Sequence, residues 1–291
     1  MHDPTGDRMK ALERASAGAA IPHDHAIYAR IDGRGFSRFT RDMQRPFDAR
    51  MTRAMLLTAS HILEEAHAAV VYVQSDEISV LWAPAIQEDG TPGEHFFGGK
   101  PQKLCSILAG MATSAFMHAL LRDPDGLADW TERMPHFDAR VVDMADPAEA
   151  VAAIAWRGQD ARRNGIRQLA SAHFSHRQLQ NRGNREVVQM LAGKGIRLSD
   201  QPKPSMNGTL LRRQLIERPL SASELDRIPP RHRPAPGALV KRHETVGFAA
   251  EHPGRITNLS DVILEGADPV LERRNTAADL AADLDHETTA V

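Results

Sequence analysis

The sequence predicts an α+β fold in which one antiparallel sheet carries helices on one face. Three observations support this prediction. Strand and helix patterns alternate in the order β-α-β-β-α-β between residues 26 and 144. The two middle strands are separated only by a tight turn, which makes them antiparallel neighbours. The chain of 291 residues is 42% hydrophobic and 25% charged, which is typical of a globular protein with a core.

The first strand is predicted at AIYARID, residues 26–32, where apolar and more polar residues alternate. Ile27, Ala29 and Ile31 share one face of this strand. The alternation leaves Asp32 at the end of the strand, on its more polar face.

Two amphipathic helices are predicted, at residues 46–67 and at about 101–121, because apolar residues recur there at steps of three and four. Lys100 and Lys103 lie at the N-terminal end of the second helix, where the helix dipole disfavours cations. An anion held between these two lysines would remove the conflict.

A β-hairpin is predicted at VVYVQSDEISVLWA, residues 70–83, with Ser75, Asp76 and Glu77 at its tip. Hairpin tips favour Asn-Gly or Asp-Gly. This tip has two adjacent acids and no glycine, so its carboxylates are candidates for a function.

A strand at 136–144 and a helical stretch at about 147–170 complete the unit. The order of elements is that of a ferredoxin-like sheet, so residues 23–170 are expected to form one domain. The rest is predicted to be a flexible N-terminal segment, a basic, helical or irregular extension suited to RNA binding, and an acidic C-terminal extension with a disordered end: residues 1–22, 171–245 and 246–291.

The net charge of −2 conceals a basic block. From Arg157 to Glu244 there are 18 Lys and Arg against 7 Asp and Glu. Such a block indicates a polyanion as partner. The alternative is an arginine-rich face that is simply solvated.

Composition also excludes some classes of protein. Cys105 is the only cysteine, so neither an intramolecular disulfide nor a cysteine-based zinc site is possible. The N-terminus lacks the apolar region of a secretory signal. We expect no stretch that approaches the length of a membrane helix, which needs about 20 apolar residues. A reducing, cytoplasmic location fits.

Asp32 and Asp76 are expected to meet at one edge of the sheet, because the end of the first strand and the tip of the hairpin are neighbours in this topology. Two carboxylates in one site repel each other unless a cation lies between them. Mg²⁺ prefers oxygen ligands and keeps positions free for phosphates, and two ions about 4 Å apart can clamp a displacement at phosphorus. This is the arrangement of palm-type polymerases and nucleotide cyclases. The Gly33 carbonyl is a further candidate ligand.

The segment IDGRGFSRFT that follows predicts a phosphate-binding loop. Gly33 and Gly35 allow the backbone to approach a bulky anion, and the amides of residues 33–37 can point at phosphate oxygens. Phe36 is expected to stack on a base. The candidate clamps for a triphosphate are Arg45, Lys100 and Lys103.

Two other patterns have open interpretations. His173 and His176 in HFSH are metal ligands, or they belong to a capped loop or an RNA-facing surface. The stretch WRGQDARRN, which begins at Trp156, meets RNA by stacking and charge, or it is a helix half-buried by Trp156.

Six segments, in order along the chain, resemble the tRNA(His) guanylyltransferase family, most closely its bacterial and archaeal guanylyltransferase-like branch: RIDGRGFSRFT, RPFDARM, QSDEISVLW, FDARVV, WRGQDARRN and HFSHRQLQ. The resemblance covers roughly residues 26–215. It implies a palm-like catalytic domain that extends tRNA in the 3′→5′ direction. In this reaction ATP or GTP activates the 5′-phosphate, which the 3′-hydroxyl of an incoming nucleotide then attacks. The resemblance also implies a tetramer.

Carried over residue by residue, the resemblance assigns two Mg²⁺ ions to Asp32, the Gly33 carbonyl and Asp76, and it adds Glu77 as a catalytic acid of the same motif. The expected nucleotide-binding residues for GTP and ATP are Asp32, Gly33, Arg34, Gly35, Phe36, Ser37, Arg45, Ser75, Asp76, Lys100 and Lys103. The expected RNA contacts are Arg162, Arg163, Asn164, His173, His176, Arg177, Arg182 and Arg185.

Two motifs depart from the family pattern. The His-Ile-Asn-Asn motif of the eukaryotic enzymes aligns with Arg162-Arg163-Asn164-Gly165, which favours template-directed repair of 5′-truncated tRNA over guanylate addition to tRNA(His). The Lys-Arg-Gly-Thr segment appears as Met206-Asn207-Gly208-Thr209, with the loss of two cations. Residues 216–291 have no match to the pattern.

Two alternative functions stay open. A nucleotide cyclase-like palm would act on free triphosphate, but it has no use for the basic block. A catalytically silent RNA-binding protein would use the block, but it has no use for the pair of Asp32 and Asp76.

Overall fold

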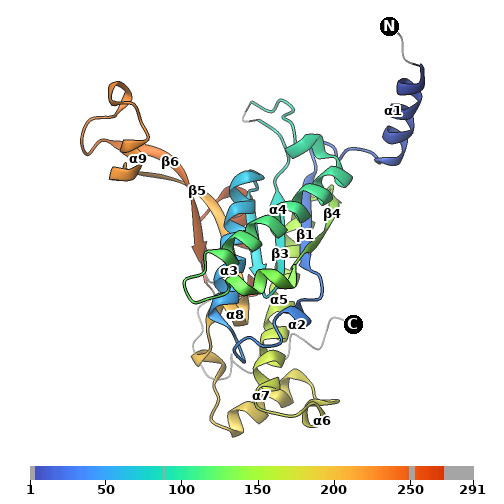
Figure 1. The fold of residues 1–291 in the computed structure, drawn as a ribbon, viewed down its shortest axis with the longest axis vertical. Helices are drawn as coiled ribbons and strands as arrows, with labels where there is room; N and C mark the ends of the chain where they lie inside the picture. The colour runs from blue at the N-terminus through green and yellow to red at the C-terminus, as the bar shows by residue number, and fades with distance from the viewer. Residues whose placement is uncertain (1–3, 88, 249–252, 272–291) are drawn as a thin grey trace.

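The computed structural model describes residues 4–87, 89–248 and 253–271 (Figure 1). Its centre is a six-stranded antiparallel sheet with the order β4-β1-β3-β2-β5-β6. The strands are β1 (Ala26–Gly33), β2 (Val70–Gln74), β3 (Glu77–Trp82), β4 (Phe137–Met144), β5 (Thr209–Pro219) and β6 (Leu239–Phe248). The α+β prediction is confirmed.

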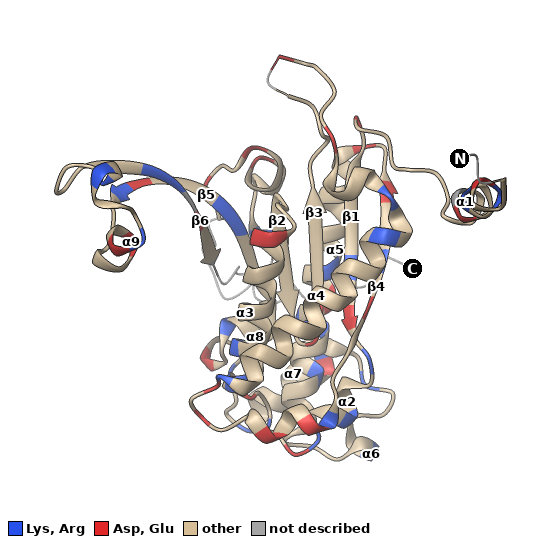
Figure 2. Ribbon diagram, turned by 45° about the horizontal axis from the view of Figure 1, so that its top comes forward, with Lys and Arg blue, Asp and Glu red and all other residues tan. Residues whose placement is uncertain are grey.

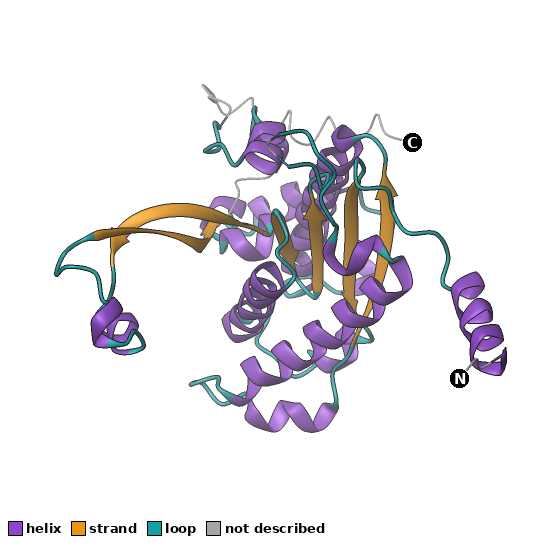
Figure 3. Cartoon of the chain, turned by 90° about the horizontal axis from the view of Figure 1, so that it is seen from above, coloured by secondary structure: helices purple, strands orange, loops and turns teal. Residues whose placement is uncertain are grey.

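Four of the strands follow the predicted β-α-β-β-α-β order. Helix α3 (Ala49–Glu65) connects β1 to β2, and α4 (Pro101–Leu121) connects β3 to β4. The strand order β4-β1-β3-β2 is consistent with the expected ferredoxin-like sheet. Helices α3 and α4 pack on each other and on one face of the sheet, where their apolar stripes meet Ile31, Val71 and Val80 (Figure 3).

The other face of the sheet is covered as well, which the sequence did not predict. Helix α5 (Pro147–Ser171) packs there through Ile154 and Ala161 against Tyr28 and Tyr72. Strand β2 is buried at all five positions, so both of its faces need cover. Contact of this apolar face with α5 is more favourable than its exposure to water, because burial of apolar surface is the main favourable term in folding.

Helix α4 is long and apolar enough to cross a membrane by length and composition, so the expectation that no stretch approaches membrane length was wrong. Its most apolar side chains lie on the sheet, however. Leu104, Leu108 and Phe116 are fully buried in the main core cluster. The helix is therefore a core element of this fold.

Strands β5 and β6 extend the sheet beyond β2 within the region expected to be helical or irregular. The first four residues of β5 are buried beside β2, whereas the rest alternates and is mostly outside the core. The far halves of the two strands project from the domain as a two-stranded arm that ends near α9 (Ala222–Asp226) (Figures 1 and 2). Three arginines and one glutamate interrupt the apolar alternation in β5, so the sequence pattern did not predict this strand.

The remaining helices are short or peripheral. Helix α1 (Pro4–Ser16) lies in the segment expected to be flexible and was not predicted. The others are α2 (Phe36–Phe39), α6 (His176–Leu179), α7 (Asn184–Gly193) and α8 (Lys203–Asn207). The expectation of disorder at the C-terminal end falls on residues 272–291, which lie outside the described residues.

Tyr72 fastens the start of β5 to the sheet. Its hydroxyl donates a hydrogen bond of 2.6 Å to the Asn207 carbonyl, and its side chain is fully buried. The next residue, Gly208, has φ +70° and ψ −174°, a conformation that is essentially restricted to glycine. A Cβ atom at this position would lie 2.3 Å from the Tyr72 hydroxyl oxygen. Glycine is therefore required here for both backbone and packing reasons.

We predict that Gly208→Ala lowers the free energy of unfolding by about 2 kcal/mol or more, because it combines a strained backbone with a clash against a buried ring. Gly247→Ala in β6 is the matched control, since a Cβ atom there meets only Leu211 at 3.8 Å. The control should stay within about 1 kcal/mol of the original protein. Urea denaturation measures both changes. Equal stabilities of the two variants would contradict the assignment.

Candidate active site

The end of β1 and the β2–β3 turn meet as the sequence predicted. Asp32 is paired in register with Glu77 of β3, and the Gly33 amide donates a hydrogen bond of 3.0 Å to the Asp76 carbonyl. The turn consists of Ser75 and Asp76 alone, because Gln74 and Glu77 already pair with each other across the hairpin. Ser75 takes a left-handed conformation with φ +48°. Asp32 and Asp76 therefore lie at the same end of the sheet.

The surroundings of Asp76 perturb its pKa. Burial raises its pKa to about 6, and the charges of Asp32 and Glu77 add to the rise, while a hydrogen bond from Ser75 opposes it. Within the described ranges, neither Asp32 nor Asp76 forms an ion pair. Two close carboxylates without a cationic partner are a donor set that suits a hard divalent cation.

The donor set is small. Among residues 4–87, 89–248 and 253–271, no group of three or more His, Cys, Asp or Glu side chains is arranged to hold a metal ion. The pair of carboxylates has four oxygens and the Gly33 carbonyl adds one, and two metal ions would share them. This fits Mg²⁺, which keeps several positions for water and for phosphate oxygens.

Glu77, the third predicted catalytic acid, is held differently from this pair. It is 8% exposed, and both of its carboxylate oxygens accept hydrogen bonds of 2.6 Å from Arg157 of α5. Arg157 also donates to Asp160 at 2.8 Å. The side chain of Glu77 is thus bound to α5 in this structure.

The glycine loop differs in detail from its prediction. A Cβ atom at Gly33 would lie 2.4 Å from the ring of Phe36, so this glycine makes room for an aromatic ring. Phe36 is 3% exposed and packs against the rings of Phe39, Phe116 and Phe137. The expectation that Phe36 stacks on a base was therefore wrong, because its ring is part of the core.

The amides of the loop are only partly available. The Gly33 amide binds the Asp76 carbonyl, and the Arg34 amide donates to the His136 carbonyl at 3.0 Å. Gly35, with φ +69°, begins the short helix α2. The first amides of a helix have no partner within the helix. The part of the predicted phosphate loop that can still bind an anion is thus residues 35–37.

A cavity of about 410 Å³ adjoins Asp76, whereas Asp32 and Gly33 are not among its lining residues. This volume lies in the usual range for small-molecule sites. Its lining includes predicted nucleotide-binding residues, namely Phe36, Ser37, Arg45, Ser75 and Asp76. It also includes Arg41, a cation on the same loop that the sequence reasoning missed, and residues from the end of α5 and from α8.

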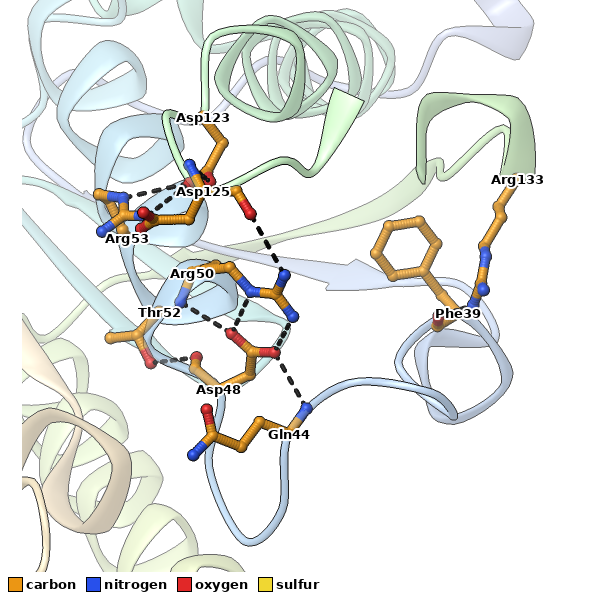
Figure 4. Close-up of polar contacts among 9 residues, drawn as sticks. All are labelled: Phe39, Gln44, Asp48, Arg50, Thr52, Arg53, Asp123, Asp125 and Arg133. Carbon is orange, nitrogen blue, oxygen red and sulfur yellow. Dashed lines mark hydrogen bonds and ion pairs between the residues drawn. The ribbon is translucent and has the colours of Figure 1, made fainter. Parts of the chain in front are cut away.

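Asp48 holds the cavity wall in place. Its carboxylate caps the start of α3 by accepting from the Arg50 amide at 2.9 Å and also accepts from the Gln44 amide at 3.0 Å (Figure 4). The Arg50 guanidinium binds the same carboxylate, and these hydrogen bonds lower the pKa of Asp48 to about 2. Residues 41–48, which carry Arg41 and Arg45, are thereby tied to α3.

Lys100 and Lys103 lie at the other end of the sheet, so they cannot clamp a triphosphate at Asp32 and Asp76 of the same chain. Gly99 accepts a hydrogen bond from Ile21, ahead of β1, and Lys103 lies 4.5 Å from the ring of Phe97. Phe96 stacks on Trp82, which pairs with Ile27. Five residues of extended strand, about 17 Å, separate Ile27 from Asp32.

The predicted RNA contacts lie on α5, α6 and α7 and in the segments that connect these helices, at the same end of the molecule as the carboxylates (Figure 1). His173, His176 and Arg177 are exposed, and Arg182 forms an exposed ion pair of 2.7 Å with Glu186. Arg185 is exposed as well. Three others make contacts within the fold: Arg162 donates to Asn207, and Arg163 and Asn164 donate to Asp160.

Comparison with known proteins gives consistent matches. Residues 6–145 match the family model of tRNAHis guanylyltransferase. A bacterial tRNA(His) guanylyltransferase-like protein, solved in complex with ATP, is 29% identical, covers 72% of this chain and 86% of its own, and has a TM-score of 0.64. A bacterial protein of the same description, in complex with GTP, is 24% identical with coverages of 87% and 94% and a TM-score of 0.65.

A viral relative matches over a similar length. An uncharacterised protein of Acanthamoeba polyphaga mimivirus is 27% identical over 233 residues, which are 75% of this chain and 80% of the relative. The family match spans β1, the β2–β3 hairpin and both carboxylates. Residues 6–145 of this chain are therefore similar to the tRNAHis guanylyltransferase family, whose members are nucleotidyltransferases.

Proposed function

We propose that this protein is a Mg²⁺-dependent nucleotidyltransferase that adds nucleotides to the 5′ end of tRNA. The observation that carries the proposal is the meeting of Asp32 and Asp76 beside a cavity lined by Ser37, Arg45 and Ser75. The bacterial relatives were solved with ATP and with GTP, and we assign the same two nucleotides to this chain as substrates.

Asp32, Asp76 and the Gly33 carbonyl would hold two Mg²⁺ ions. When bound, these ions would neutralise the phosphates and stabilise the charge that develops on the oxygens during displacement. The protein's own part is to position the reactants. The amides of residues 35–37 face the anion, and Arg41 and Arg45 supply positive charge from the cavity wall. In this scheme, attack by a nucleotide 3′-hydroxyl on the activated 5′-phosphate breaks one P–O bond and forms another.

We further propose that the substrate is a 5′-truncated tRNA which is repaired on a template. The support comes from the segment Arg162-Arg163-Asn164-Gly165, which departs from the His-Ile-Asn-Asn motif of the family. The other departure concerns RNA binding. Met206 and Asn207, which replace two cations, are buried: Met206 packs with Ile166 of α5, and Asn207 is bound by Tyr72 and Arg162. These positions fasten α8 to the fold and offer no charge to an RNA phosphate.

The first part of the basic block, residues 157–207, would offer the polyanion a surface beside the cavity, whereas much of the rest lies on the projecting arm of β5 and β6. Residues of α5 and α8 line the cavity, and α6 and α7 lie at the same end of the molecule (Figure 2). A cyclase acting on free triphosphate has no use for this surface, and a silent RNA-binding protein has no use for the carboxylate pair of Asp32 and Asp76. We expect a homo-oligomer, as the family resemblance implies, in the cytoplasm.

Asp76→Asn should abolish nucleotide transfer and stabilise the metal-free protein. The folded-state pKa of Asp76 is raised to about 6, so ionisation costs stability as the pH rises through that value. Removal of this charge should raise the free energy of unfolding at pH 7.5 by about 1–3 kcal/mol. No gain is expected at pH 4, where the carboxyl is protonated. Denaturation without divalent ions measures this, and wild-type activity in the variant would refute the metal assignment.

The direction of growth is tested with a blocked substrate. A 5′-monophosphorylated tRNA that lacks its first nucleotide and carries a blocked 3′ end should be extended in the presence of ATP, GTP and Mg²⁺. The carboxylates alone do not set the polarity, because palm-type sites of either polarity use the same pair. Loss of extension on blocking the 3′ end would show that the polarity is the opposite one.

Arg182→Glu with Arg185→Glu should weaken tRNA binding, because the new charges repel phosphates. The plot of log K against log salt should become less steep by about 0.7–0.9 for each phosphate that the variant no longer binds. Affinity for free GTP should hardly change, since both residues lie outside the cavity lining. Unchanged tRNA affinity and salt slope would identify these arginines as a solvated face.

A further inference from the structure

Glu77 is one of the two cross-strand neighbours of Asp32, a proposed metal ligand, and Asp138 of β4 is the other. Glu77 stands directly opposite Asp32 in the β1–β3 ladder. Side chains of directly opposed residues in antiparallel strands lie on the same face, with Cβ atoms about 5 Å apart. Glu77 also follows Asp76 in sequence. A free carboxylate at this position would thus lie beside both acids of the proposed site.

Arg157 binds the Glu77 carboxylate, so this carboxylate is not free beside Asp32. Its Nε donates to Glu77 Oε1 and its Nη2 to Oε2, both at 2.6 Å, in the bidentate geometry that arginine favours. Arg157 is 6% exposed, and its guanidinium lies 4.6 Å from the centre of the Trp156 ring. Arg157 and Glu77 are 80 positions apart in sequence, so this contact ties α5 to the hairpin.

The charges around this contact are balanced. Arg157 also binds Asp160, which in turn accepts from Arg163 at 3.1 Å. Arg30 lies 3.9 Å from Glu77. Of the acids around this end of β1 and β3, Glu77 and Asp160 are therefore neutralised by arginines. Among the described residues, no ion pair neutralises Asp32, Asp76 or the exposed Asp138, and no three acids there are arranged to hold a metal ion.

We propose that Arg157 is a positioning residue that withholds Glu77 from the metal site. The inference rests on the proposed function, because it takes Asp32 and Asp76 as the metal ligands. With two carboxylates, the ions keep coordination positions for the phosphates of the nucleotide and the RNA. A third carboxylate would occupy one of these positions and add repulsion toward the incoming phosphates.

The test is the affinity of the full-length protein for Mn²⁺ alone, measured by paramagnetic resonance of the free ion, together with kcat and KM for nucleotide transfer. Arg157→Met frees Glu77 beside Asp32, so Mn²⁺ should bind about fivefold more tightly or better. Turnover should fall at least about tenfold while KM for the nucleotide changes less. Loss of a structural contact alone would weaken Mn²⁺ binding.

Two further variants complete the cycle. Arg157→Met combined with Glu77→Gln should return Mn²⁺ affinity to within about twofold of wild type, since the freed carboxylate is gone. Glu77→Gln alone leaves the arginine charge in excess and should weaken Mn²⁺ binding about threefold, and it tests the proposal even if Arg157→Met does not fold. Unchanged affinity in Glu77→Gln, or a gain in Arg157→Met that the second substitution fails to reverse, would overturn the proposal.

Arg53→Met is the matched control. Arg53 also joins two elements through an ion pair, 2.7 Å from the buried side chain of Asp123. The Arg53→Met substitution should lower the melting temperature without a change in Mn²⁺ affinity. Asp32→Asn separates this proposal from the proposed function. If Asp32→Asn binds Mn²⁺ like wild type, the metal site itself is wrong. If it loses Mn²⁺ and the Arg157 variants do not differ from wild type, only the positioning role fails.

Discussion

The constraint on which the site depends is the close approach of two carboxylates that the backbone forces together. The Gly33 amide binds the Asp76 carbonyl, and the strand ladder places Asp32 at the same end of the sheet. Water would favour separating these charges, and burial raises the pKa of Asp76 to about 6. The fold holds the acids in place through its sheet and its core, so that a cation can offset the repulsion on binding.

The elements around this end of the sheet hold its loop, the cavity wall and the hairpin in place. The aromatic cluster around Phe36 holds the glycine loop against the core. The Asp48 cap fixes the wall that carries Arg41 and Arg45, and Arg157 fixes the hairpin from the opposite face. The acids are thus placed by rigid elements on both sides of the sheet. This is the pre-organisation that a site for phosphoryl chemistry requires.

The sequence predicted the features that depend on local periodicity and on chain order. The strand that ends at Asp32, the hairpin with Asp76 at its turn and the helices α3 and α4 follow from patterns within a few residues. The position of Lys100 depends on geometry beyond such patterns: β3 runs away from the site, so α4 must begin at the far end. The antiparallel strand order was enough to predict that Lys100 lies far from the site, but the pattern of charges was not.

Contacts between distant segments were beyond the reach of the sequence. Nothing in WRGQDARRN indicates that its first arginine binds Glu77, which lies 80 positions earlier in the chain. Likewise, nothing in IDGRGF tells whether Gly33 makes room for an anion or for the ring of Phe36. Strand β5 was missed because its exposed half carries charges and owes its pairing to β6. The structure brings Asp32 and Asp76 to one end of the sheet, as the order of the local elements predicts.

The most direct test of the account is the position of bound metal ions. Crystals grown with Mn²⁺ and a GTP analogue that cannot be hydrolysed would reveal the ions by their anomalous scattering. The account predicts density between the carboxylates of Asp32 and Asp76, within about 2.5 Å of their oxygens, with Glu77 still bound to Arg157. Ions that lie elsewhere, or that Glu77 ligates in the wild-type protein, would contradict it.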